Sequence, residues 1–180
     1  MAEQDRVAIV GAGPVGLTLA LLLGRAGIPT VVLEAEADIA EELRASTFHP
    51  PTLDMLDTLG LAQPLIAQGL VTPTWQVRMH ATGERAEFDL SVLADDTAHP
   101  FRLQAEQHKL SRLLLAALAG EPAVEVRFGH AVTTVEQGAE GARVAGAEFA
   151  LDARYVIGCD GARSVVRRAM GLAFEGDTYP

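Results

Sequence analysis

Three glycines near the start of the chain have the spacing of a phosphate-binding turn. Gly11, Gly13 and Gly16 form the pattern G-x-G-x-x-G within "VAIVGAGPVGLTLALLLGRAG". A short apolar run typical of a buried strand, residues 7–10, precedes them, and residues 17–26 indicate a buried helix. Glycines allow a tight turn, close approach of the backbone to a pyrophosphate, and close packing of helix on strand. A helix N-terminus also attracts phosphate, although a glycine-rich turn without a ligand is the alternative.

An acidic residue follows at the position that a nucleotide ribose requires. Residues 30–34 indicate a second strand, and Glu34 at its end lies roughly 20 positions after the last glycine, as in a dinucleotide-binding βαβ unit. Its carboxylate can accept hydrogen bonds from a ribose diol and would repel a 2′-phosphate, which disfavours NADP at this particular site. FAD and NAD both contain an ADP half, so this unit alone does not separate them.

A second motif lies far downstream in "YVIGCDGARSVVRR". Asp160 and Gly161 follow a predicted buried strand, and ligands of open α/β sheets bind beyond the carboxyl ends of the strands. Asp160 can accept hydrogen bonds from a hydroxylated chain, and Gly161 allows close approach of the backbone. An Asp-Gly turn with a helix cap is the alternative for this motif.

Four features in this order resemble the class A, single-component flavoprotein monooxygenases, the aromatic hydroxylases related to para-hydroxybenzoate hydroxylase. The glycine motif is the first, and the downstream family pattern D-G-x-x-S-x-V-R reads "DGARSVVR" here. Arg44 occupies the slot of an arginine that follows the second strand. Gln107 occupies that of a glutamine opening the next long helix, with Gln104 as a nearby competitor. The resemblance covers the whole chain.

The resemblance implies that FAD is the cofactor and that NADH or NADPH is the reductant. It implies that the pyrophosphate lies on the glycine turn, the adenosine ribose on Glu34, and the adenine against the backbone of a strand after "FGHA". The Asp-Gly motif would contact the ribityl or pyrophosphate region, and Arg163 would meet the reductant. The implied cofactor-binding residues are Gly11, Gly13, Pro14, Val15, Gly16, Glu34, Ala35, Arg44, Gln107, Val132, Asp160, Gly161 and Arg163. For Arg44, Gln107 and Arg163 the alternative is an ordinary surface or helix-start residue.

The implied activity is hydroxylation of a phenolic or polyketide-like aromatic with molecular oxygen, through a flavin hydroperoxide. The cofactor carries this chemistry, so no catalytic side chain is assigned. Two alternatives remain open: a truncated, non-catalytic FAD- or ADP-binding module, and an FAD reductase or halogenase on the same scaffold. The family's third motif, a Gly-Asp followed by Ala and His, is not matched by Gly176-Asp177. We therefore expect the N-terminal portion of a longer protein.

The expected fold is α/β, a Rossmann-like FAD-binding domain with a parallel sheet, helices and a small antiparallel meander. The domain spans residues 1–180, with partial substrate-domain strands at about residues 71–104 and the C-terminal part of the family fold missing. An amphipathic helix is predicted over residues 106–119, a hairpin over 74–90 with its turn at Gly83, and a meander over 132–151. The strand over 155–157 is expected to be buried.

Composition narrows the function further. The chain has 180 residues and a formal net charge of −10, which argues against nucleic acid as a partner. Residues 15–23, the longest apolar stretch, are too few to span a bilayer, and no signal peptide is recognised, so a cytoplasmic protein with no membrane partner is expected. A homodimer is left open. No metal site is expected, the five histidines are assigned to surfaces or loops, and Trp75 and the phenylalanines are assigned to cores.

Overall fold

The computed structural model describes residues 5–41 and 45–177. The chain divides into two compact units, each described here by itself. The first comprises Met1–Ala40 and Leu114–Pro180, and the second comprises Glu41–Leu113. Helix α4 (Gln107–Leu118) begins in the second unit and ends in the first.

A four-stranded parallel sheet forms the centre of the first unit, with the strand order β12-β1-β2-β8. Continuous apolar runs suit such strands because both of their faces are covered. The residues of β1 and β2 are all buried, whereas β12 lies at the edge of the sheet and its Tyr155 is 61% exposed. The prediction that this strand is buried was therefore wrong. The strands are β1 (Val7–Val10), β2 (Thr30–Leu33), β8 (Val124–Arg127) and β12 (Tyr155–Gly158).

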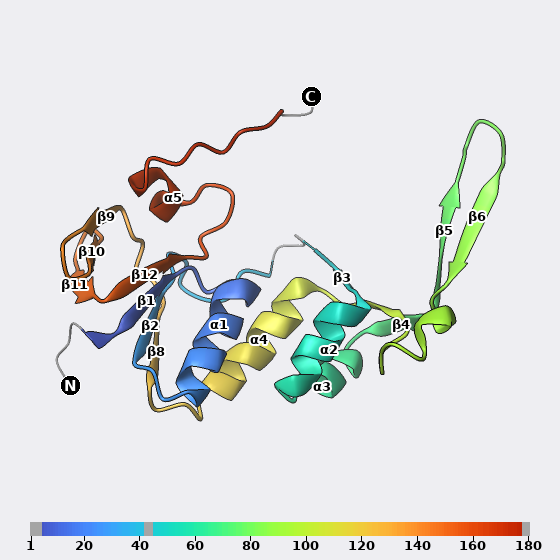
Figure 1. Cartoon of the computed structure of the whole chain (residues 1–180), viewed down its shortest axis with the longest axis horizontal. Helices are drawn as coiled ribbons and strands as arrows, with labels where there is room; N and C mark the ends of the chain where they lie inside the picture. Colours follow the sequence, from blue (N-terminus) through green and yellow to red (C-terminus); the bar gives the residue numbers. More distant parts are fainter. Residues whose placement is uncertain (1–4, 42–44, 178–180) are drawn as a thin grey trace. The chain divides into compact units, whose positions relative to one another are not determined.

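The two faces of this sheet pack against different elements (Figure 1). Helix α1 (Pro14–Arg25) lies on one face and buries Leu17 and Leu21. It ends at Arg25, and Gly27, with a φ of +70°, follows just after the C-cap residue Ala26. A three-stranded antiparallel meander lies on the other face and is followed in the chain by β12 and the short helix α5. These elements are β9 (Thr134–Gln137), β10 (Ala142–Ala145), β11 (Ala150–Ala153) and α5 (Val165–Ala169).

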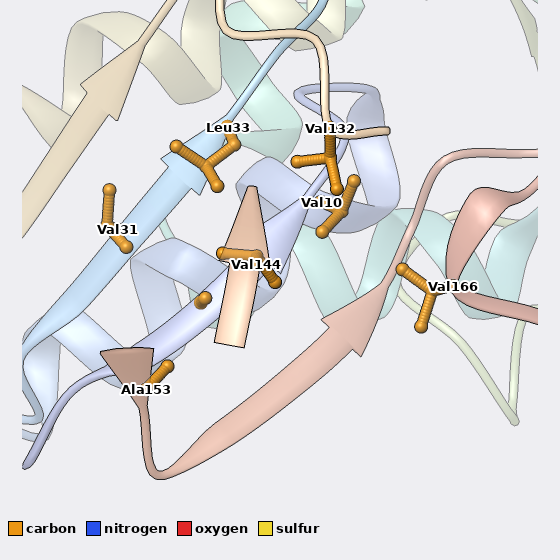
Figure 2. Packing of buried hydrophobic residues seen from close by; sticks show 8 residues of the cluster. Val10, Val31, Leu33, Val132, Val144, Ala153 and Val166 are labelled. Atoms are coloured by element: carbon orange, nitrogen blue, oxygen red, sulfur yellow. The ribbon is translucent and has the colours of Figure 1, made fainter. Parts of the chain in front are cut away.

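A core of small aliphatic side chains joins the meander and α5 to the sheet (Figure 2). Alternate residues of β1 and β2 point into it, as the pleat of a strand requires. Val132 belongs to this core and is 8% exposed. It was predicted to lie within a strand, but β9 begins two residues later. The cluster consists of Ala8, Val10, Val31, Leu33, Val132, Val144, Ala153 and Val166.

The described part of the second unit contains α2, α3, a 3₁₀ helix and the start of α4, together with an antiparallel sheet of order β3-β7-β4 and a hairpin. The hairpin has the predicted turn, with Gly83 at φ +72°. Its Trp75 stacks on Phe88 at a centroid distance of 4.4 Å, but the two rings are 36% and 44% exposed, so their assignment to a core was wrong. The elements are β3 (Thr47–Phe48), α2 (Pro50–Thr58), α3 (Ala62–Ile66), β4 (Leu70–Thr72), β5 (Thr74–Arg78), β6 (Arg85–Asp89), the 3₁₀ helix η2 (Leu90–Leu93) and β7 (Arg102–Gln104).

Within the described residues, none of the helices combines the length and the apolar character that crossing a bilayer would require.

Candidate functional site

The first glycine of the turn is fixed by the two strands beside it. Gly11 has a φ of +105°, which residues with a side chain rarely adopt, and its N–H donates to the Leu33 carbonyl at 2.8 Å. A Cβ at this position would lie 2.5 Å from the Cys159 carbonyl oxygen. The turn therefore passes so close to the end of β12 that only glycine fits.

The second glycine is open to its surroundings. Gly13 is the N-cap of α1, in an extended conformation (φ −71°, ψ 177°), and no side chain caps the helix. A Cβ built on Gly13 would meet no protein atom within 4 Å. Pro14 begins the helix, and Val15 is 69% exposed. The first N–H groups of a helix lack intrahelical partners and lie at its positive end, so this bare surface fits a pyrophosphate.

The third glycine packs the helix onto the turn. A Cβ at Gly16 would lie only 2.0 Å from the Gly11 carbonyl oxygen. It would also lie 3.3 Å from the Cβ of Cys159. The start of α1 can therefore approach the turn only because Gly16 has no side chain.

The Glu34 carboxylate is held against the same turn. Its Oε2 accepts a hydrogen bond from the Ala12 N–H at 2.7 Å, and its Oε1 accepts from the Glu36 N–H at 3.0 Å. The backbone is also fixed, because the Glu34 N–H donates to the Arg127 carbonyl at 2.9 Å. A carboxylate offers about four lone-pair sites, so the remaining ones can accept from ribose hydroxyls. Ala35 beside it is exposed.

Asp160 adds to the cap of α5, whose N-cap residue is Ser164. Its carboxylate accepts from the Ser164 hydroxyl at 2.5 Å and from the Val165 and Val166 N–H groups at 2.6 and 3.3 Å. Ser164 in turn accepts from the Arg167 N–H at 3.0 Å. The helix cap that the sequence left open as an alternative is thus present, and contact of Asp160 with a ligand stays a prediction.

Loss of the Asp160 cap should destabilise the first unit. For Asp160→Ala we expect the free energy of unfolding to fall by about 1–2 kcal/mol, the usual effect of losing an N-terminal cap. Urea unfolding measured by circular dichroism checks this, with the exposed Glu148→Ala as the control. Equal stability of the two variants would show that the cap contributes little.

The two sequence motifs lie side by side although they are far apart in the chain. Val10 and Gly158 are partners in the parallel ladder, and the Cys159 N–H donates to the Val10 carbonyl at 2.8 Å. The Asp160 Cα lies 3.1 Å from the position of a Cβ on Gly11. Burial, and then the charge of Asp160, raise the pKa of the Cys159 thiol, so it remains a neutral thiol.

The glycine turn, the Glu34 carboxylate and the Asp-Gly motif thus lie together at the carboxyl ends of three neighbouring strands. These strands are β1, β2 and β12, respectively. This is where open α/β sheets bind ligands. Sequence reasoning missed the bond from the Ala12 N–H to Glu34. It also missed the Cys159 carbonyl that confines Gly11. Both are backbone contacts, for which the residue types give no signal.

The other predicted residues have different surroundings. Gly161 has a φ of +72° and open space beside it. Arg163 is exposed, and its carbonyl accepts from Arg168 at 2.6 Å. Gln107 opens α4 in the second unit, where its N–H donates to the Ala45 carbonyl at 3.0 Å. Arg44 lies outside the described residues.

A hollow of about 750 Å³ lies elsewhere in the first unit, between the meander, β12 and α5. Gly138, Gly141, Tyr155 and Met170 are among its lining residues, and the glycine turn is not. The turn is the better candidate site, because its geometry has a specific requirement for glycine. In the part of the chain that the structure describes, histidine, cysteine and acidic side chains form no group of three that could hold a metal ion.

The chain is similar to known proteins over nearly its whole length. The chain is 40% identical, over 99% of its length, to para-nitrophenol 4-monooxygenase of Pseudomonas sp. WBC-3, and 37% identical, over 94%, to a Streptomyces rimosus protein named 12-dehydrotetracycline 5-monooxygenase/anhydrotetracycline 6-monooxygenase. The crystal structure of p-nitrophenol 4-monooxygenase PnpA from Pseudomonas putida DLL-E4 matches 98% of the chain, with a TM-score of 0.90 and 38% identity. The chain covers 45%, 33% and 46% of these three proteins.

The expected α/β fold is confirmed by this likeness, with its parallel sheet, helices and antiparallel strands. The model of the family described as "FAD binding domain" matches residues 4–180. Together with the glycine turn and the resemblance to flavin monooxygenases, this match establishes that the chain belongs to the FAD-binding domain family.

Proposed function

We propose that this chain is the FAD-binding portion of an NADH- or NADPH-dependent flavoprotein monooxygenase that hydroxylates a phenolic or polyketide-like aromatic. The observation that carries the proposal is the gathering of the bare Gly13 surface, the Glu34 carboxylate and the Asp160-Gly161 motif at three adjacent strand ends. The names of the relatives support the reaction class, since one is a para-nitrophenol monooxygenase and the other a monooxygenase of 12-dehydrotetracycline and anhydrotetracycline.

In this proposal the residues at and beside the glycine turn have separate roles in binding FAD. Gly11 and Gly16 shape the turn, and the N–H groups at the start of α1 hold the pyrophosphate beside Gly13. Glu34 holds the adenosine ribose while remaining bonded to Ala12. Bound FAD would supply the hydride-accepting and oxygen-activating chemistry. The protein's own residues therefore bind and orient the cofactor rather than react.

The remaining assignments rest on the family resemblance. We propose that Asp160 contributes to cofactor binding through the backbone that it orders as well as through its carboxylate. Arg163, which is exposed, is proposed to meet the reductant. We also propose that Gln107 lies beside the ribityl chain and Arg44 near the phosphates or the ribityl chain, while the backbone of Val132 lies against the adenine. The strands within residues 71–104 are proposed to begin the substrate domain.

A titration of the purified chain with FAD tests the proposal. We expect saturable binding with one FAD per chain, seen as quenching of flavin fluorescence, and competition by ADP because the ADP half contacts the turn. No quenching at FAD concentrations far above the protein concentration would refute the assignment. Hydroxylation is tested on the longer parent protein, in which NADH or NADPH oxidation should rise with a suitable phenol.

A non-catalytic FAD- or ADP-binding unit is the second candidate. It is favoured because the residues proposed to hold the ADP half lie within one unit. Stoichiometric FAD binding without reduction of the flavin by NADH or NADPH would support this candidate. Any turnover by the isolated chain would exclude it.

Substitution of Glu34 separates ribose binding from stability. Glu34→Ala should weaken FAD binding by about 1–3 kcal/mol, as expected for a lost hydrogen bond to a charged group. It should also lower stability, because the N–H of the buried Ala12 loses its acceptor. Glu34→Gln keeps an acceptor for that N–H but loses the charge, so it should weaken binding with little loss of stability. Dissociation constants and urea midpoints check both variants; unchanged FAD affinity in both would argue against a ribose contact.

A further inference from the structure

A buried histidine in the second unit is tied to a helix by a small polar cluster. His99 lies in the loop between η2 and β7, as the sequence predicted for the histidines, but it is only 3% exposed. Its Nδ1 lies 2.7 Å from Oδ1 of Asp54 on α2. The Thr97 hydroxyl donates to the same carboxylate at 2.7 Å and accepts from the His99 N–H at 3.0 Å. We call Asp54, Thr97 and His99 the Asp54 cluster.

The Asp54 cluster stands at the start of a continuous backbone connection. The Phe101 N–H donates to the His99 carbonyl at 2.7 Å, and the rings of these two residues meet edge to face at 5.9 Å. Strand β7 follows at once and lies between β3 and β4, with Leu103 fully buried. At the far end, the Gln107 N–H donates to the Ala45 carbonyl. Residues 97–107 are therefore held at both ends.

The Asp54 cluster lies outside both sequence motifs. None of the three residues belongs to the nucleotide turn or to the Asp-Gly motif, and a buried histidine needs a hydrogen-bond partner. Hydrogen bonds from His99, and then from Thr97, hold the pKa of the Asp54 carboxyl below its usual range. The folded-state pKa lies below the unfolded one, so the contribution of this carboxylate is complete at pH 7 and is lost only below about pH 4.

We propose that Asp54 is a positioning residue. From α2 it holds Thr97 and His99 in place by hydrogen bonds, and it thereby fixes the position of the β7 backbone that leads to Gln107. The carboxylate also determines which nitrogen of the His99 ring carries a proton. It accepts a hydrogen bond only from a protonated Nδ1. The part of the proposal that concerns Gln107 rests on the proposed FAD function. The ordering of β7 does not.

Amide hydrogen exchange at pH 7 tests the positioning role without any ligand. In Asp54→Ala, exchange of the β7 amides should accelerate about tenfold or more, the effect of losing hydrogen bonds to a charged group. Asp57→Ala is the matched control, since Asp57 lies exposed on the same helix. Exchange in β8 should stay unchanged in both variants. Equal β7 exchange in Asp54→Ala and the wild type would overturn the proposal.

A second pair of variants tests the hydrogen bond itself. The amide nitrogen of asparagine can take the place of Nδ1, whereas that of glutamine reaches further, so His99→Asn should keep β7 exchange within about threefold of the wild type. His99→Gln should resemble Asp54→Ala. If asparagine rescues no better than glutamine, the Nδ1–Asp54 bond has no positioning role. This pair decides the question even if Asp54→Ala fails to fold.

The FAD dissociation constants of the same variants test the link to Gln107. We expect Asp54→Ala and His99→Gln to weaken FAD binding at least threefold, and Asp57→Ala and His99→Asn to leave it unchanged. Unchanged affinity in Asp54→Ala, together with faster β7 exchange, would overturn the link to Gln107. Absence of FAD binding in the wild type would refute the proposed function instead, and the exchange results would still decide the positioning role.

Discussion

Replacing Gly13 with valine is expected to abolish FAD binding while the chain remains folded. The Gly13 backbone is extended, with φ −71° and ψ 177°, a conformation that valine adopts readily. The new Cβ would meet no protein atom within 4 Å. The space it enters is the space through which a pyrophosphate would approach the start of α1. We therefore expect the FAD dissociation constant to rise about 100-fold or more, which corresponds to roughly 3 kcal/mol.

The measurement compares flavin fluorescence titrations with urea unfolding curves. Gly13→Val should have nearly the stability of the wild type and no measurable FAD affinity. Leu22→Ala is a useful control, because Leu22 is exposed near the other end of α1 and its substitution adds no bulk. A folded Gly13→Val variant with wild-type affinity would place the cofactor somewhere other than this turn.

Replacing Gly16 with alanine is expected to have the largest effect on stability. The added Cβ would lie 2.0 Å from the Gly11 carbonyl oxygen, a backbone atom. Gly11 cannot move aside easily, because its N–H is bonded to Leu33 and its own Cα faces the Cys159 carbonyl. Such overpacking typically costs 1–3 kcal/mol and sometimes more, and we expect about 3 kcal/mol here.

Two other glycines provide the scale for this prediction. Alanine is intrinsically a better helix former than glycine by roughly 1 kcal/mol, so destabilisation by Gly16→Ala would come from the clash alone. Gly13→Ala meets open space and should be nearly neutral. Gly24→Ala faces the Cγ2 of Val124 at 2.6 Å, a side chain that can shift, and should lie between the two. Urea midpoints in any other order would contradict the packing described for the turn.

The sequence predicted the elements whose signals are local. Apolar runs beside glycines marked β1, β2 and β8, and helical spacing marked α4 almost to its ends (Figure 1). Strand β3 was missed, and β4 and β7 fall within the strand region predicted at about residues 71–104 without being delimited, because each has only two or three residues and is defined by partners distant in the chain. Such short segments have no periodicity to detect.

The candidate site was predictable in its parts and only partly in its assembly. Motif spacing placed Gly11, Glu34 and Asp160 at strand ends, and the sheet order then brings these ends together. The loop position of His99 was predicted but its burial was not, because its partner, Asp54, lies on an element distant in the sequence. Trp75 was assigned wrongly because aromatic character alone does not reveal that its hairpin is exposed.

Mapping FAD onto the backbone amides tests the central claim most directly. A ¹⁵N-labelled chain titrated with FAD should show its largest chemical-shift changes at the turn and at the end of β2, namely at Gly11, Ala12, Gly13, Val15, Gly16, Glu34 and Ala35. Amides lining the hollow, such as Gly138, Gly141 and Tyr155, should change little. Large changes around that hollow, with the glycine turn unaffected, would contradict the account.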